Sequence, residues 1–235
     1  QELSLICPPG TVTALVGPSG GGKSTLARLI ARFWDVDSGT VLVNGRDVRD
    51  QPSRELLSSM SLVFQDVMLS TDTVRANIAL GNADATEHEI EEAARAACIH
   101  DRIMQLPDGY GTIIGEGAHL SGGEAQRLTI ARAFLAASPI LILDEATAQA
   151  DSHSERLIQQ AISNLAQKRT VIVIAHRLST IQGVDQIAVI DAGRLVELGT
   201  HDDLLTQDGP YARLWRNQTN IAHALEGLRG KEQAC

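Results

Sequence analysis

The sequence predicts an α/β fold in which a mostly parallel central sheet carries an inserted α-helical lobe. Four short apolar runs have the pattern of buried parallel strands, and each stops at a polar or glycine residue. They are residues 12–16 before Gly17, 61–64 before Gln65, 140–143 before Asp144, and 171–175 before His176. Residues 87–106, between the second and third runs, have apolar side chains at helical spacing and predict the lobe. Open parallel sheets bind ligands beyond the carboxyl ends of their strands, so we expect the four polar ends to converge on one site.

Composition limits the classes of protein to which the chain can belong. Its 235 residues, 43% of them hydrophobic, are enough for one sizeable core. The formal net charge of −9 argues against a nucleic-acid partner, because such partners attract a basic face. Cys7, Cys98 and Cys235 lack the paired spacing of a zinc site, which favours reduced thiols in a cytosolic compartment. No apolar run approaches the roughly 18 residues of a membrane-spanning helix, so we expect the chain as given to be soluble.

The rest of the chain completes the expected organisation. Residues 186–190 and 195–198 flank a turn at 191–194 and predict a β-hairpin. The polar tail after Trp215 is expected to form a helix that frays into disorder. We expect residues 1–80 and 138–215 to form the two parts of a sheet-containing subdomain, 81–137 to form a helical subdomain, and 216–235 to form a C-terminal helix or tail.

Residues 17–24 fit the pattern of a phosphate-binding loop, with a predicted strand before them and a predicted helix, 23–32, after them. Glycines let the backbone curl so that N–H groups point inward, the helix N-terminus adds positive potential, and Lys23 adds a full charge. A glycine-rich turn is the alternative, but the flanking elements favour binding of ATP or GTP. The predicted nucleotide-binding residues are Gly17, Pro18, Ser19, Gly20, Gly21, Gly22, Lys23, Ser24 and Thr25, with Ser24 also a magnesium ligand.

Polar residues at the other strand ends predict the chemistry of this site. Asp144 suits a ligand of Mg²⁺ or of its waters, and Glu145 suits a group that polarises the attacking water. An acidic helix cap is the alternative for this pair. Gln65 alone would be an ordinary surface amide and His176 alone a buried structural histidine, but at strand ends Gln65 can contact magnesium and His176 the γ-phosphate. The predicted metal ligands are therefore Ser24, Gln65 and Asp144, and the predicted catalytic residues are Glu145, His176 and Gln65.

A second phosphate cradle, without a lysine, lies further along the chain. It consists of Leu120, Ser121, Gly122, Gly123 and Glu124, and a predicted helix, 125–137, follows it. Serine and glycines at a helix N-terminus present backbone donors. A plain helix cap is the alternative. Since one chain rarely needs two γ-phosphate sites, this cradle is predicted to complete the site of another copy, so that two domains enclose two nucleotides head to tail.

The order of these motifs resembles that of the ABC ATPases, a branch of the P-loop NTPase fold. The phosphate loop, Gln65, residues 120–124, residues 141–147, Asp151 and His176 follow one another as in that family. Residues 74–78, Gly115-Glu116 and residues 199–205 resemble short sequence motifs of the exporter-type (type IV) subfamily. The resemblance implies that residues 120–124 are the signature motif that reaches ATP on the partner domain, that Glu145 is the catalytic base, and that Asp151 lies in a loop linking the two sites.

The resemblance also implies cofactors, partners and a cellular place. ATP and Mg²⁺ are the expected cofactors, and a second nucleotide-binding domain, like or unlike, is the expected partner. A transmembrane domain is expected upstream, which would hold the domain at the cytoplasmic face of the inner membrane. The chain begins 16 residues before Gly17, so we expect that the adenine-stacking aromatic residue and the first strands of the family are not included.

Two departures from the family pattern bear on coupling and substrate. Residues 115–120 are one residue shorter than usual, in the region expected to contact the membrane domain. Residues 148–151, Ala-Gln-Ala-Asp, resemble the corresponding residues of ABC proteins that move iron–siderophore complexes.

The leading hypothesis for the function is a transport motor. A soluble ABC ATPase of DNA repair or translation would carry coiled-coil insertions or tandem motors with basic surfaces, and a switch without turnover would lack Glu145 or His176.

Overall fold

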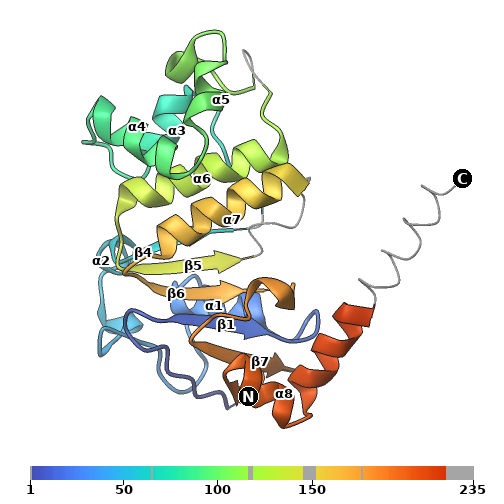
Figure 1. Cartoon of the computed structure of the whole chain (residues 1–235). Coiled ribbons are helices and arrows are strands. Elements are labelled where there is room, and N and C mark those ends of the chain that lie inside the picture. The colour runs from blue at the N-terminus through green and yellow to red at the C-terminus, as the bar shows by residue number, and fades with distance from the viewer. Residues whose placement is uncertain (1, 65, 116–118, 145–151, 176, 221–235) are drawn as a thin grey trace, which may run out of the picture. The chain divides into compact units, whose positions relative to one another are not determined.

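The computed structural model describes residues 2–64, 66–115, 119–144, 152–175 and 177–220. The chain forms two compact units, residues 1–27 with 172–235 and residues 28–171, and each is described by itself. Figure 1 labels the helices and strands that the text refers to. Within the described ranges, no helix combines the length and the apolarity that a membrane crossing requires.

The first unit contains a sheet in the order β6-β1-β7-β8, to which the end of β6 (Thr170–Ile174) contributes. β1 (Val12–Val16) is almost completely buried and pairs in parallel with β7 (Gln186–Asp191). β8 (Arg194–Gly199) pairs antiparallel with β7, which confirms the predicted hairpin. Ala192 and Gly193 form its turn with φ angles of 46° and 72°, the left-handed pair that matches the twist of two-residue hairpins.

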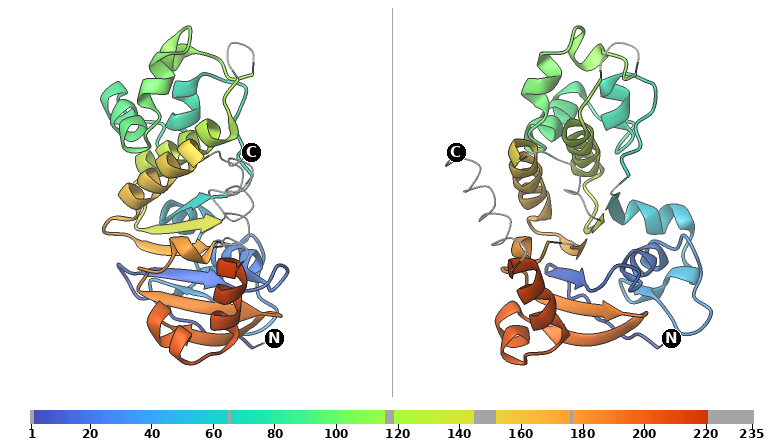
Figure 2. Two further views of the ribbon diagram at one scale, coloured as in Figure 1. Left: turned by 45° about the vertical axis from the view of Figure 1, so that its right-hand side comes forward. Right: turned by 90° about the vertical axis from the view of Figure 1, so that its right-hand side faces the viewer.

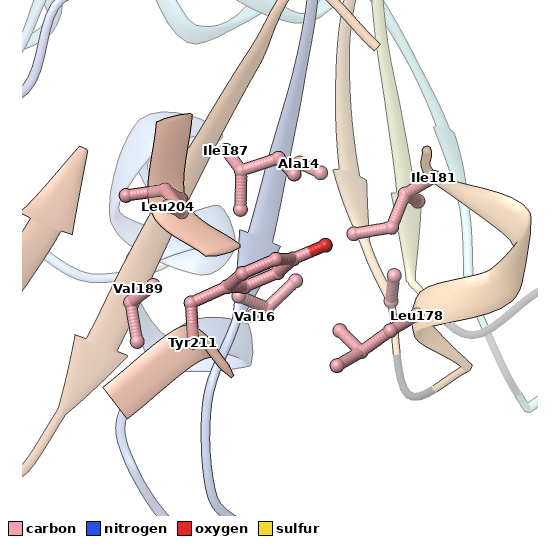
Figure 3. Packing of buried hydrophobic residues seen from close by; sticks show 9 residues of the cluster. Ala14, Val16, Leu178, Ile181, Ile187, Val189, Leu204 and Tyr211 are labelled. Carbon is pink, nitrogen blue, oxygen red and sulfur yellow. The ribbon is translucent and has the colours of Figure 1, made fainter. Parts of the chain in front are cut away.

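Tyr211 is at the centre of the core of the first unit (Figure 3). It is fully buried, on a helix that starts at Pro210 after α8 (His201–Thr206). The surrounding side chains come from β1, β7, α8, the 3₁₀ turn η3 (Leu178–Thr180) and the residue after that turn, and include Ala14, Val16, Ile187, Val189, Leu204, Leu178 and Ile181. A buried hydroxyl without a partner would cost about 1–3 kcal/mol, and here His201 Nδ1 lies 2.7 Å from the Tyr211 hydroxyl. Burial raises the pKa of Tyr211 to about 12.

The second unit places helices over a parallel strand pair. β4 (Met60–Val63) pairs with β5 (Ile140–Asp144), and β2 (Leu42–Val43) pairs antiparallel with β3 (Arg46–Asp47). α6 (Gly122–Ala136) packs against β4 and against three helices, α3 (Val74–Ala79), α4 (Glu87–Ala96) and α7 (Ser152–Ala166) (Figure 2). The remaining elements are α2 (Ser53–Ser58), α5 (His100–Met104), η1 (Val48–Asp50) and η2 (Gly109–Gly111), while α1 (Lys23–Ile30) enters from the first unit.

Two of the predicted helices end earlier than their apolar spacing indicates. The predicted helix 87–106 is divided into α4 and α5, because Cys98 takes a left-handed φ of 55°. The Ile99 N–H then bonds to the Ala94 carbonyl, 3.0 Å away, as in a Schellman C-cap. α1 ends in the same way, with Arg32 at φ 53° and the Phe33 N–H bonded to the Arg28 carbonyl at 2.9 Å. Glycine usually occupies such positions, so the sequence carries no signal for these two ends.

Candidate nucleotide-binding site

The phosphate loop lies between the end of β1 and the start of α1, in the first unit. β1 delivers the chain at Gly17, where φ is 139° and a Cβ atom would overlap the Ile190 carbonyl oxygen. At Gly21, an added Cβ would lie 2.8 Å from the same oxygen. The Gly193 N–H, from the turn of the β7–β8 hairpin, donates to the Gly21 carbonyl at 2.8 Å. The loop is thus fixed by direct backbone contact with the hairpin, and only glycine fits at these two points.

Lys23 is the cation of this loop. It is only 4% exposed, and its Nζ donates to the carbonyls of Gly17 at 3.0 Å and Pro18 at 2.9 Å. A buried ammonium requires such acceptors, because desolvating a charge without partners is costly. The lysine therefore curls over the loop whose N–H groups form the predicted anion nest. An incoming phosphate would exchange these carbonyl acceptors for charged oxygens, which make stronger hydrogen bonds.

The second cradle, Leu120–Glu124, lies at the N-terminus of α6 in the second unit. α6 begins at Gly122, inside the motif, and not at residue 125 as predicted, because Ser121 and Glu124 form a complete capping box. The Glu124 N–H donates to Ser121 Oγ at 3.3 Å, and the Ser121 N–H donates to Glu124 Oε2 at 2.9 Å. Ser121 and Gly122 remain exposed to solvent.

Glu124 has a further partner that the sequence did not indicate. Arg102 Nε, from α5, donates to Glu124 Oε1 at 2.7 Å. Partial burial disfavours the charged form of Glu124, but the Ser121 N–H and the Arg102 guanidinium outweigh this effect and hold the pKa of the carboxyl below its usual range. The negative charge on the second cradle is therefore stable and paired.

The remaining predicted site residues divide into described and undescribed ones. Asp144 ends β5 and is 9% exposed, as expected for a carboxylate at a strand end. Gln65, Glu145, Asp151 and His176 lie outside the described residues, and so do residues 116–118 of the shortened segment. The phosphate-loop residues are together in the first unit, and the second cradle and Asp144 are in the second. The convergence of the four strand ends stays a prediction.

A groove of about 460 Å³ lies within the second unit. It is bordered by α2, β4, the segment after β4, and α6, and its lining residues include Leu57, Met60, Phe64, Asp66, Met68, Leu80, Gly81, Thr129, Arg132 and Ala136. Arg132 donates through Nε to the Asn77 carbonyl at 3.0 Å, and burial lowers its pKa. Met68 is 81% exposed and Leu80 64% exposed, so the rim of the groove is apolar and open to solvent.

Sequence reasoning missed Arg102, the bracing of the phosphate loop by Ile190 and Gly193, and this groove. The capping box was readable as Ser-x-x-Glu before an apolar run. The ion pair was not, because Arg102 and Glu124 are 22 residues apart and belong to no common motif.

Three comparisons with known proteins support one family. The model of the family described as ABC transporter matches residues 1–148. The mycobactin import ATP-binding/permease protein IrtA of Mycobacterium tuberculosis is 54% identical over 233 residues, which are 97% of this chain and 27% of that protein. The putative multidrug export ATP-binding/permease protein YgaD of Bacillus subtilis is 50% identical over 219 residues, 93% of this chain and 38% of that protein.

A solved structure agrees with the described fold. The structure of a bacterial Atm1-family ABC exporter with ATP bound matches with a TM-score of 0.86 and 46% identity, over 92% of this chain and 38% of that one. The predicted α/β fold and the resemblance to exporter-type ABC ATPases are thereby confirmed. This chain spans between a quarter and two fifths of the length of these relatives. On the strength of the family model and of relatives aligned over more than nine tenths of its length, the chain belongs to the ABC transporter family, as an ATP-binding domain.

Proposed function

We propose that this chain is the ATP-hydrolysing motor of an exporter-type ABC transporter, which closes head to tail on ATP with a second such domain. The observation that carries this proposal is the phosphate loop, in which Lys23 is bent over backbone fixed by the β7–β8 hairpin. Closing on ATP and reopening after hydrolysis would move an attached membrane domain between two states.

The residues of the chain would divide the chemistry among themselves. The phosphate loop and Lys23 bind the phosphates and favour their negative charge. Ser24, Gln65 and Asp144 would hold Mg²⁺, since hydroxyl, amide and carboxylate oxygens suit this hard cation, and when bound it neutralises the phosphates. Glu145 accepts the proton of the water that attacks the γ-phosphorus while ADP leaves, His176 contacts the γ-phosphate, and Asp151 links the two sites.

The second cradle would act on ATP held by the partner domain. Ser121 and Gly122 are exposed at the start of a helix of 15 residues, whose N-terminal potential favours an anion. Unlike the phosphate loop, this cradle contains no cation of its own within residues 120–124. A motif that supplies hydrogen-bond donors but no cation is suited to adding contacts to a nucleotide that another domain already binds.

The membrane domain would dock on the groove between β4 and α6. The curated relatives are named ATP-binding/permease proteins, and this chain covers only 27% and 38% of their length, so a permease part is the occupant that the comparisons favour. The exposed Met68 and Leu80 at its rim suit an apolar partner. We propose that the motor docks there from the cytoplasmic face of the inner membrane.

An iron–siderophore complex is the substrate class that we propose. The Ala-Gln-Ala-Asp variant at 148–151 favours it, and so does the mycobactin importer among the relatives. The relatives also include a protein named for multidrug export, so the family alone does not fix the substrate or the direction of transport.

The first test is the ATPase activity of the full-length protein that contains this domain, beside its Glu145→Gln variant. The wild type is expected to hydrolyse ATP, and the variant to lose turnover while it still binds ATP and keeps the dimer closed. Glu92→Gln, a surface glutamate on α4, is the matched control and is expected to behave as wild type. Wild-type turnover in the Glu145→Gln variant would mean that Glu145 is not the base. Absence of turnover in the wild type would reject the motor itself.

A further inference from the structure

The signature motif of this chain has an electrostatic problem. Its last residue, Glu124, places a carboxylate in the first turn of the helix whose N-terminus would receive the partner's γ-phosphate. Two negative groups at one helix N-terminus compete for the same N–H donors and the same positive potential, and they repel each other. Some feature of the chain must therefore neutralise Glu124 if the motif is to bind a phosphate.

Arg102 meets this requirement. It donates to Oε1 of Glu124 at 2.7 Å, while Oε2 accepts the Ser121 N–H at 2.9 Å, so each carboxylate oxygen has its own donor. The pair is partly shielded from water, with side-chain exposures of 32% for Arg102 and 18% for Glu124, which makes the interaction stronger than that of a fully exposed pair.

The position of Arg102 is fixed by its own surroundings. It is on the short helix α5, next to Ile103, which is 1% exposed and belongs to the core of the second unit. His100, at the start of the same helix, has its Nδ1 2.8 Å from the Tyr110 hydroxyl. The guanidinium is thus presented to α6 by a packed element and not by a loose loop.

A second capping box in the same chain shows that such an arginine is not required for capping. At the start of α4, Glu89 accepts from the Thr86 N–H at 2.7 Å and from its hydroxyl at 2.8 Å. Among the described residues, Glu89 forms no ion pair and is fully exposed. The capping geometry is the same in both places, so the arginine at the signature motif serves a need that the α4 box does not have.

We propose that Arg102 is a positioning residue of the signature motif: its ion pair neutralises Glu124 and keeps the carboxylate turned onto the Ser121 N–H, which leaves the glycine N–H groups to the γ-phosphate. This inference rests on the proposed function, because it assumes that residues 120–124 bind a phosphate. Arg102, a residue of the helical lobe, would thus influence the nucleotide bound to the partner domain indirectly, through residues 120–124.

The test compares variants of the full-length protein by the KM and kcat of ATP hydrolysis and by thermal unfolding. Arg102→Met is expected to raise the KM for ATP about five- to tenfold, because an uncompensated carboxylate would then face the phosphate. Arg102→Lys keeps the charge and is expected to keep most of the wild-type KM. Adding Glu124→Gln to Arg102→Met removes the carboxylate charge but leaves a capping side chain, so most of the loss should be recovered.

The controls and the contrary outcomes separate positioning from mere structural support. Arg95→Met and Glu89→Gln, both on α4, are expected to leave KM unchanged. If Arg102→Met and the double variant are equally impaired, or if KM rises only in step with a lower melting temperature, Arg102 merely ties α5 to α6 and the inference is wrong. An unchanged KM in Arg102→Met also refutes it. A wild type that does not hydrolyse ATP rejects the proposed function instead.

Discussion

The phosphate loop of this chain and the predicted second cradle are built by different physical means. The phosphate loop is made of backbone: glycines pressed against the Ile190 carbonyl, a hydrogen bond from Gly193, and a buried Lys23 as cation. The second cradle is made of side chains: Ser121 and Glu124 cap α6, and Arg102 pairs with Glu124. The first brings its own positive charge, whereas the second is neutralised within the chain. We infer that the first can capture a nucleotide alone and that the second serves to complete a site.

The largest expected effect comes from removing the cation of the first cradle. In the full-length protein, Lys23→Met should weaken ATP binding between about tenfold and a hundredfold, because a hydrogen bond to a charged group contributes about 1.5–3 kcal/mol. Titration with a fluorescent ATP analogue measures this. Lys168→Met removes an exposed lysine and should leave binding unchanged. If the Lys23→Met variant binds ATP as tightly as the wild type, the positive charge of Lys23 does not distinguish the phosphate loop from the second cradle.

A steric substitution tests the backbone construction of the first cradle. Gly21→Ala would bring a Cβ atom to 2.8 Å from the Ile190 carbonyl oxygen, so the loop or the hairpin must shift. We expect a loss of about 1–3 kcal/mol in the free energy of unfolding, together with weaker ATP binding. Gly111→Ala is the matched control, since its Cβ would meet only Asp108 Cβ at 3.8 Å. Thermal unfolding measures the stability of both variants. Equal stabilities would contradict the inference that contact with the Ile190 carbonyl fixes the phosphate loop.

A pair of cap substitutions sharpens the difference between a cap and a cradle. Ser121→Ala and Thr86→Ala each remove an N-cap hydroxyl that accepts from the third helical N–H, and each should lower the free energy of unfolding by about 1 kcal/mol. Only Ser121→Ala should also raise the KM for ATP in the full-length protein. If both variants leave KM unchanged, the second cradle is simply a helix cap.

The smallest expected effect concerns the far end of α6. Ala137 caps this helix with a left-handed φ of 50°, a conformation that costs alanine more than glycine. Ala137→Gly should therefore raise the free energy of unfolding by up to about 1 kcal/mol and leave the KM for ATP unchanged. A change in KM would show that the cradle responds to the stability of α6 as a whole, and not only to its capping residues.

The strands were the most predictable part of the fold. β1 has the predicted limits, and the other five predicted strands differ from β4, β5, β6, β7 and β8 by no more than one residue at either end, because buried β-branched runs end where polar residues begin. The two-residue strands β2 and β3 were not predicted. Helix ends were predicted less well. Arg32 and Cys98 take the left-handed conformation that glycine usually marks, and the capping box at Ser121 lets α6 start on two glycines.

The candidate site was predictable where one motif supplies all its parts. The phosphate loop has the expected strand, glycines and lysine in place. The ion pair of Arg102 with Glu124 was not predictable, since it depends on how α5 packs near α6 and not on spacing in the sequence. The roles of Gln65, Glu145, Asp151 and His176 stay predictions.

The groove between β4 and α6 also affects how this domain should behave in a test tube. Met68 is 81% exposed and Leu80 is 64% exposed at this groove, so the separate domain in solution would have an apolar surface in contact with water. Exposed apolar surfaces promote weak, non-specific association between protein molecules. This association increases with protein concentration and with salts that strengthen apolar interactions. Light scattering of the separate domain would therefore contain a nucleotide-independent part. Only the increment that appears on adding ATP should be counted as the pairing of two motors.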